Sequence, residues 1–241
     1  MVVDLGLSLW RLGGAAFSPL SLSPIAWYDP SDFSTLFQNS NGTTAVTADG
    51  DPVGYMADKS GNGHHLIQAT AASRPLYKTS GGLRWLEFDG TDDFLAVSYG
   101  GNLTEPWEAV SALRRLSASN GHLIGGAGDN IGVLYINSSQ LRIYSGAEVT
   151  GLAAPASGAD FVATQRHNGA SSRIAIDNGS YTAGDDGGTA ATGLTVGAGV
   201  GGASDFSAMR FVGRALFSSL QTDPNLALLR TYLAAKQGRV L

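Results

Sequence analysis

The chain has 241 residues, with 15 basic and 20 acidic side chains, a net charge of −5 and no cysteine. The lack of cysteine excludes disulfides, thiolate metal sites and a cysteine nucleophile. No basic run or stripe is present, so the electrostatic attraction that dominates nucleic-acid binding is missing and DNA or RNA is not an expected partner. The 33 glycines and the low share of charged residues, 15%, are typical of short strands joined by tight turns.

Residues 1–24 differ from the rest of the chain. They are mostly apolar, but Asp4 and Arg11 interrupt the run and no basic segment precedes it, so we expect no signal peptide. Elsewhere no apolar run approaches the roughly 20 residues that span a bilayer, and membrane insertion is not expected. The pattern fits an N-terminal arm over 1–24 that docks on a neighbouring chain, with Trp10 as an anchor, and it fits an edge strand of the same domain equally well.

From residue 25 onward, short β-branched and aromatic runs alternate with turn residues. Two strands are expected at 83–88 and 94–99, on either side of the turn sequence DGTDD. A hairpin is expected over 131–143, turning at Asn137-Ser138-Ser139. Further strands are expected at 161–166, 173–177, 194–199 and 208–217. Such spacing with glycine-rich turns predicts an all-β fold, a β-sandwich or jelly roll.

One segment predicts a helix instead. Asp223 is expected as the N-cap, Pro224 as the first helical residue and Gly238 as the end. The helix would pack on the sandwich through one apolar stripe, made of Leu226, Leu229, Tyr232 and Leu233.

Four segments follow one another in a characteristic order: WYDPSDFSTLF at 27–37, DKSGNGHHLIQAT at 58–70, RPLY at 74–77 and LRWLEFDGTDDFLAV at 83–97. In these segments the chain resembles the laminin G-like domains of the concanavalin A-like lectin/glucanase superfamily. RIAIDNG, LTVGAG and the segment 211–238 resemble that group's closing strands and terminal helix, so the resemblance covers 25–238. It implies a concanavalin A-like jelly-roll β-sandwich over 25–241 with a short C-terminal helix. It implies no single function, because this fold hosts lectins, hydrolases, adhesins and scaffolds.

The variant with WYDPSD near the start and YLAAKQG at the end resembles the domains found in bacteriophage and prophage virion proteins. That resemblance implies a tail, fibre or decoration role, located in the virion. Partners would be other virion proteins, reached through the arm, in a homo-oligomer or symmetric assembly.

The glucanases of this superfamily carry E-x-D-x-x-E on one strand, which points to Glu87, Asp89 and Asp92. Glu87 and Asp89 share a strand face, but Gly90 and Thr91 start a turn before Asp92. Retaining hydrolysis needs two carboxyl groups about 5–5.5 Å apart, which a residue beyond a turn meets poorly. We therefore expect no enzyme and assign no catalytic residue, and we keep glycoside hydrolysis as the less favoured alternative.

The segment DKSGNGHH at 58–65 offers side chains that could bind metal or transfer protons, but we interpret it mainly as a loop. Asp58, Ser60 and Asn62 can satisfy backbone donors in a glycine-rich turn. His64 and His65 point to opposite sides of an extended chain, so they do not chelate one ion together. No metal ligand is assigned here.

Calcium is a possible ligand, since many relatives bind it through loop oxygens. No loop has the D-x-D-x-D-G spacing of a self-contained site, so a site would be assembled from several loops, and solvated acidic turns are the favoured interpretation. The candidate oxygen ligands are Asp92, Asp93, Asp129, Asn130, Asp185 and Asp186.

Glycan binding requires an exposed aromatic side chain with polar groups beside it. The residues that fit are Trp107, Asp129, Asn130, Tyr135 and Tyr144, whereas Trp27 and Trp85 lie in strand-like contexts and are expected in the core. The sequence thus favours a non-enzymatic virion protein that binds host-surface glycans as a lectin-like adhesin. The alternative is a structural decoration or assembly protein with no sugar ligand.

Overall fold

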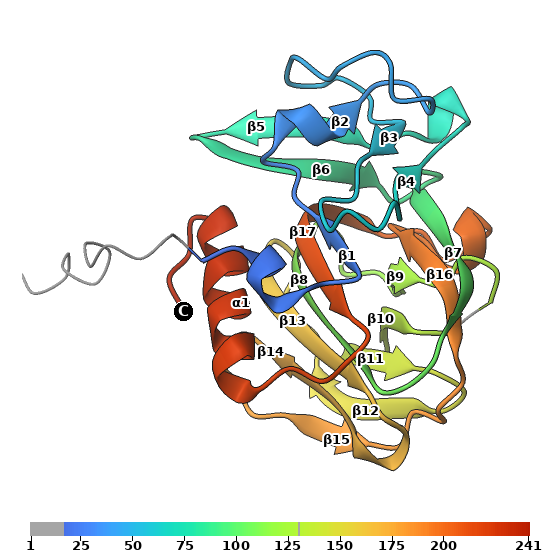
Figure 1. Ribbon diagram of the computed structural model, residues 1–241, viewed down its shortest axis with the longest axis vertical. Coiled ribbons are helices and arrows are strands. Elements are labelled where there is room, and N and C mark those ends of the chain that lie inside the picture. The colour runs from blue at the N-terminus through green and yellow to red at the C-terminus, as the bar shows by residue number, and fades with distance from the viewer. Residues whose placement is uncertain (1–16, 130) are drawn as a thin grey trace, which may run out of the picture.

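The computed structural model of the protein describes residues 17–129 and 131–241. In these residues the fold is an all-β sandwich of two antiparallel sheets, with one α-helix near the C-terminus (Figure 1). The predicted fold class is confirmed. No helix in the described part of the chain is long and apolar enough to cross a membrane.

Sheet A contains eight strands in the order β15-β14-β13-β8-β17-β6-β5, with β1 paired to β17. Their bounds are β1 Ala26–Tyr28, β5 Leu76–Ser80, β6 Leu83–Asp89, β8 Trp107–Arg115, β13 Asp160–His167, β14 Ser172–Ile176, β15 Thr182–Gly184 and β17 Ala208–Phe217.

Sheet B contains nine strands in the order β12-β11-β10-β9-β16-β7-β4-β3-β2. Their bounds are β2 Leu36–Phe37, β3 Tyr55–Met56, β4 Leu66–Ile67, β7 Leu95–Leu103, β9 Gly121–Gly125, β10 Val133–Asn137, β11 Gln140–Tyr144, β12 Glu148–Ala153 and β16 Ala191–Val196.

Short 3-10 helices connect the strands: η1 Pro19–Leu22, η2 Phe33–Thr35, η3 Ala71–Ser73, η4 Gly169–Ser171 and η5 Val200–Gly202. The expected hairpin is formed by β10 and β11, with Asn137 opposite Gln140 and with Ser138 and Ser139 in the left-handed region at φ 50° and 62°. Such backbone angles match the right-handed twist of a two-residue hairpin turn.

The main hydrophobic core lies between the two sheets, where alternate residues of the facing strands interdigitate. On β10 and β11 the inward residues are Leu134, Ile136, Leu141 and Ile143, so the residues between them face outward. This alternation places Tyr135 and Tyr144 on the outer face of sheet B.

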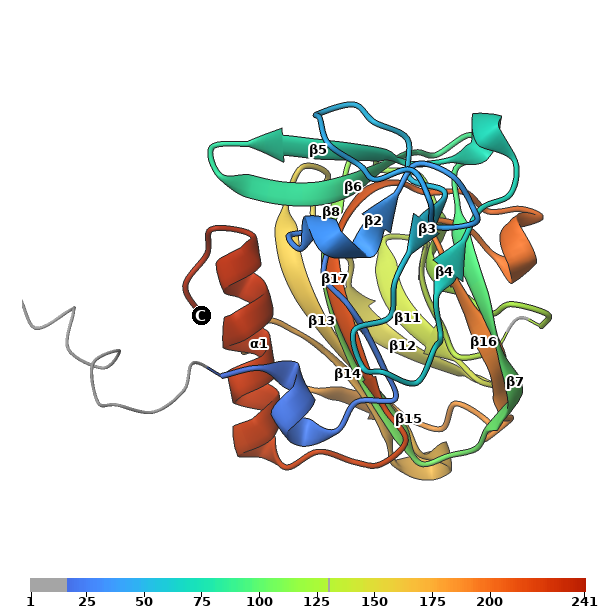
Figure 2. The same ribbon diagram turned by 45° about the horizontal axis from the view of Figure 1, so that its top comes forward.

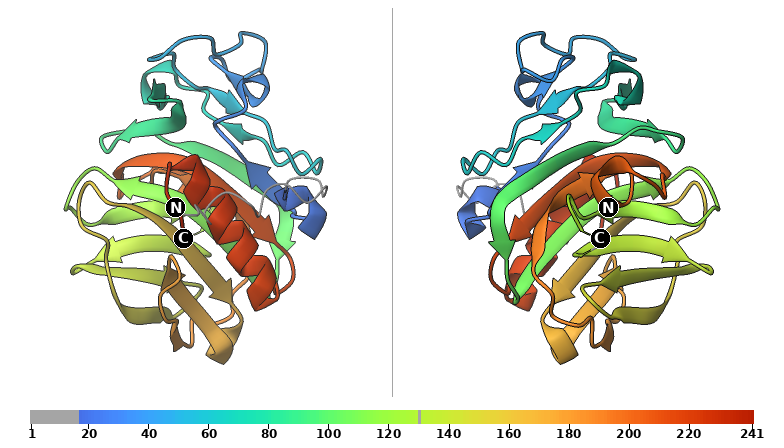
Figure 3. Two further views of the ribbon diagram at one scale, coloured as in Figure 1. Left: turned by 90° about the vertical axis from the view of Figure 1, so that its left-hand side faces the viewer. Right: turned by 90° about the vertical axis from the view of Figure 1, so that its right-hand side faces the viewer.

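A second core lies between the outer face of sheet A and α1, Asp223–Lys236. Trp27 and Trp85 belong to this core, as predicted, together with Leu226, Leu229 and Leu233 of the helix. The N-cap is Thr222, whose side chain accepts the N–H of Asn225, so the helix begins one residue earlier than predicted and Asp223 lies in its first turn. The left view of Figure 3 shows α1 lying across the sheet.

The predicted arm is described only from residue 17. Phe17 packs edge-on against Tyr232 of α1, with ring centroids 5.9 Å apart, and η1 follows directly. Leu22 also packs on the core beneath the helix. Residues 17–24 therefore lie against the sandwich, at the side of α1 (Figure 2). Trp10 and the rest of 1–16 lie outside the described residues.

Candidate functional site

The loop at 58–65 is held by its own polar side chains. The Asp58 carboxylate accepts the backbone N–H groups of Trp27, Ser60 and His64 at 2.8–3.1 Å. His65 Nδ1 accepts the N–H of Asp58 at 3.0 Å. These bonds tie the loop to β1, which agrees with the structural interpretation of DKSGNGHH.

The carboxylates around the β6–β7 turn are also engaged locally. Glu87 accepts from Trp85 Nε1 at 3.1 Å and pairs with Arg210 at 3.2 Å. Asp89 accepts the N–H of Thr91 at 2.7 Å within the turn. Glu87 therefore faces the side of sheet A that carries Trp85 and the helix.

The candidate calcium ligands do not converge as a set. Asp92 accepts from Ser73, Asp129 accepts from Thr192, and Asp186 lies beside His167. Asp92 and Asp93 lie close to Asp89, and burial raises the pKa of Asp93 to about 6. Asn130 lies outside the described residues.

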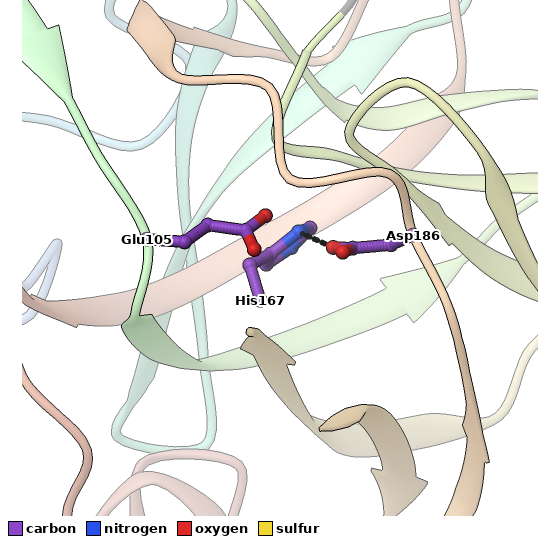
Figure 4. A group of neighbouring side chains, drawn as sticks. All are labelled: Glu105, His167 and Asp186. Atoms are coloured by element: carbon purple, nitrogen blue, oxygen red, sulfur yellow. Dashed lines mark ion pairs between the residues drawn. The ribbon is translucent and has the colours of Figure 1, made fainter. Parts of the chain in front are cut away.

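Glu105, His167 and Asp186 form a group in the interior, which their wide separation in the sequence did not suggest (Figure 4). His167 and Asp186 are fully buried, and His167 Nδ1 lies 2.5 Å from Asp186 Oδ2, although the ring N–H and the carboxylate are not well aligned. The Ser172 hydroxyl donates to the other Asp186 oxygen at 2.7 Å. Glu105 accepts the N–H of Gly169 at 2.5 Å. Burial, followed by the neighbouring carboxylates, raises the pKa of Glu105 to about 7.

The hydrogen-bond partners of His167 decide which ring nitrogen carries the proton. Arg214 can only donate, and its Nη1 lies 2.8 Å from Gln165 Oε1. The amide nitrogen of Gln165 therefore faces His167 Nε2, at 3.0 Å, and donates to it. Nε2 is the acceptor, so the ring proton resides on Nδ1 and points toward Asp186. Burial lowers the pKa of His167, which agrees with a neutral ring.

This protonation state does not fit a metal ion at the three residues. A cation between them would take the Nδ1 lone pair, and Nε2–H would then need an acceptor. Gln165 instead presents a donor to Nε2. We therefore interpret the group as a structural polar cluster, in which His167 and Asp186 are buried and Glu105 is partly exposed.

The burial of Trp107 corrects the predicted glycan site. The expected exposed indole is 2% exposed and stacks on His167, with ring centroids 3.8 Å apart and an interplanar angle of 14°. It lies in the core between the sheets, close beneath Gly132, rather than under α1. The expectation of exposure is wrong because β8 runs through the centre of sheet A, so that Trp107 is covered by sheet B.

Tyr135 and Tyr144 do lie on the outer face of sheet B, where Tyr135 has several polar neighbours. Its ring stacks on His122 of β9, with centroids 5.1 Å apart and planes at 17°. Its hydroxyl donates to Glu148, which also pairs with Arg142 at 2.8 Å. Burial lowers the pKa of His122, and the nearby Asp205 opposes this effect. We call this outward surface of β9–β12 the open face.

In the described part of the chain no α-helix covers the open face, as the right view of Figure 3 shows. Two adjoining hollows border it. The outer hollow, about 210 Å³, is lined by Asn120, Gly121, His122, Tyr135, Ile136, Asn137 and Asp205. The inner hollow, about 290 Å³, shares Asn120 and Ile136 with it and leads to the edge between the sheets. It is lined further by Asp89, Gly90, Arg115, Ser117, Ser119, Leu123, Phe206, Ser207 and Ala208.

Sequence reasoning found Tyr135 but did not select His122, Asn120 or Arg115. Register supplies the missing signal, since His122 lies opposite Tyr135 in the β9–β10 pair. A third hollow, about 420 Å³, lies beside the 58–65 loop and includes His64 and Tyr99. There the Asn62 amide is already donated to the carbonyl oxygens of Pro24 and Ile25.

No protein-family model matches the chain, and no curated protein matches it. Solved structures match in fold. Trypanosoma rangeli sialidase in complex with 2,3-difluorosialic acid has a TM-score of 0.59 and 11% identity over 95% of this chain and 35% of the sialidase. The binding domain of botulinum neurotoxin DC, in complex with rat synaptotagmin II, has a TM-score of 0.57 and 14% identity over 88% of this chain and 52% of that domain. The chain thus spans about a third to a half of these neighbours and shares with them a β-sandwich fold.

Proposed function

We propose that the protein is a non-enzymatic, lectin-like module that binds glycans at the open face. The observation that carries the proposal is the His122–Tyr135 stack, which borders two polar hollows on the face that α1 leaves uncovered. A sugar presents apolar C–H faces and many hydroxyl groups, so a binding site needs an aromatic surface with donors and acceptors around it. Tyr135 supplies the aromatic surface, and Asn120, Asn137 and Asp205 supply the polar groups.

The distribution of carboxylates supports a binding role over hydrolysis. Among the described residues, Asp205 is the carboxylate that lines the outer hollow, and Asp89 is the one that lines the inner hollow. Most glycoside hydrolases use two carboxyl groups on either side of one bond. Asp89 is also held in its own turn by the N–H of Thr91, which leaves it poorly placed as a nucleophile.

The virion setting of this proposal rests on the sequence resemblance of WYDPSD at 27–32 and YLAAKQG at 232–238. Phe17 adds a geometric argument, because it lies on α1, the side of the sandwich opposite the open face. Attachment of residues 1–16 to a neighbouring virion protein would therefore leave the open face free for a host-surface glycan. A symmetric assembly would present several such faces, and avidity would strengthen weak individual sites.

The decisive experiment is a glycan array probed with the full chain and with two variants, Tyr135→Ala and Tyr181→Ala. Tyr181 is also partly buried, but it contacts Arg173 and Arg230 on the sheet A side, so it is a matched control. We expect saturable signals that weaken by roughly tenfold in Tyr135→Ala, as for an aromatic hot spot, and stay unchanged in Tyr181→Ala. A repeat with chelator identifies any calcium requirement. An array without signals from folded protein would contradict glycan binding and leave the decoration role.

A further inference from the structure

Arg115 is a buried cation beside the inner hollow. It is 6% exposed, and its guanidinium donates to the carbonyl oxygens of Pro155 at 2.6 Å and Ser119 at 3.4 Å. Several other arginines pair with a carboxylate within 4.0 Å, among them Arg114, Arg142 and Arg166. In the described residues no carboxylate lies within that distance of Arg115, although Asp89 lines the same hollow.

Arg115 lines the inner hollow and has N–H groups that these two carbonyl oxygens do not use. A guanidinium carries five N–H donors, and the two carbonyl oxygens account for two of them. Burying a charge without a counter-ion is costly, and burial accordingly lowers the pKa of the Arg115 guanidinium. A ligand anion would offset this cost and could accept two parallel hydrogen bonds from the planar fork.

The rest of the hollow is suited to a small polar ligand. Hydroxyl and amide groups come from Ser117, Ser119, Asn120 and Ser207, and an apolar floor comes from Leu123 and Ile136. Its volume, about 290 Å³, is close to the lower end of the roughly 300–1,000 Å³ typical of ligand pockets.

We propose that the inner hollow binds the carboxylate of an acidic sugar, with Arg115 as its principal partner. The inference rests on the proposed function and specifies its ligand class. The carboxylate would lie against the guanidinium, and the glycan would continue past Asn120, which lines both hollows, toward Tyr135. Asp89 at the rim favours a singly charged group, since it would repel a doubly charged phosphate more strongly.

The test is a glycan array that carries uronic and sialic acid glycans, sulfated and phosphorylated glycans and neutral glycans, with a duplicate in which the carboxylates are methyl-esterified. Binding of the full chain should concentrate on the carboxylated glycans and fall at least tenfold on the esterified duplicate. Esterification removes the charge and keeps the sugar, so the comparison needs no protein variant.

Variants then assign the effect to Arg115. Arg115→Gln should remove the preference for the free acid, and Arg115→Lys should keep part of it, because a point charge lacks the planar fork. Arg230→Gln on α1 is the matched control and should change nothing. If Arg115→Gln does not fold, the esterification result decides alone.

Each other outcome overturns the inference in a recognisable way. Signals on neutral glycans that esterification does not change would refute the acidic ligand and keep the lectin proposal. Equal binding of sulfated or phosphorylated glycans would show an unselective anion site. An array without signals from folded protein would refute both proposals.

Discussion

Two histidine rings in residues 17–129 and 131–241 stack face to face on a larger aromatic ring, and the two stacks have opposite surroundings. Trp107 and His167 stack at 3.8 Å between the sheets, where both side chains are almost fully buried. His122 and Tyr135 stack at 5.1 Å on the open face, beside the outer hollow. Residue type alone does not separate them. The difference lies in burial: Trp107 and His167 lie between the sheets with the buried Asp186 beside them, whereas the outer stack borders space that a ligand can fill.

The largest expected effect comes from removing the interior ring. Trp107→Ala should lower the free energy of unfolding by about 3–5 kcal/mol, because it deletes a large buried side chain and leaves a cavity under sheet B. Urea denaturation followed by circular dichroism measures this loss. Tyr135→Ala is the paired control on the open face and should cost less than about 1 kcal/mol, since its ring is only partly buried. Equal losses in the two variants would contradict the contrast between the stacks.

The hydrogen bonds that run from Arg214 through Gln165 to His167 should contribute nearly as much to the free energy of unfolding. Gln165→Met keeps the size of the side chain but removes the acceptor for Arg214 and the donor for His167 Nε2. Two buried groups lose a partner, so we expect a loss of about 2–4 kcal/mol in the free energy of unfolding. Gln140→Met, at the start of β11 on the partly exposed hairpin, is the control. A Gln165→Met variant as stable as the wild type would mean that the chain from Arg214 to His167 does not form.

Much of the fold could be predicted because local patterns decide it. Alternation along 131–143 gave the β10–β11 hairpin, and the apolar stripe of 223–238 gave the terminal helix. The helix start was wrong by one residue, because Thr222 and Asp223 are both good capping residues and only the backbone geometry separates them.

The site was harder to predict because it is made by pairings between distant segments. Arg115 and Ser207 are 92 positions apart (207 − 115), yet they line one hollow. Trp107 follows a turn-like sequence, LTEP, and was therefore expected to be exposed. Its burial depends on the central place of β8 in sheet A, which no local pattern reveals. The grouping of Glu105, His167 and Asp186 depends in the same way on how β8, β13 and the segment after β15 meet.

The smallest expected effect is the pH dependence of stability that arises from Glu105, which lies beside the interior stack. Burial raises the pKa of Glu105 from 4.5 to about 7, so between these values the folded protein binds more protons than the unfolded chain. The contribution of Glu105 to stability is therefore present below pH 4.5 and is lost as the pH rises toward 7. Because the side chain is partly exposed, we expect less than about 1 kcal/mol after solvent screening.

Glu105→Gln isolates this contribution, since the amide resembles the protonated acid and can still accept the N–H of Gly169. The difference in unfolding free energy, variant minus wild type, should rise between pH 4.5 and 7 and then remain constant. The difference is measured because His167 changes the unfolding free energy with pH in the opposite direction. Burial lowers the pKa of His167, so its contribution to stability is lost as the pH falls below 6.5, and this loss is the same in the wild type and in the variant. A difference that does not change with pH would show that Glu105 is solvated.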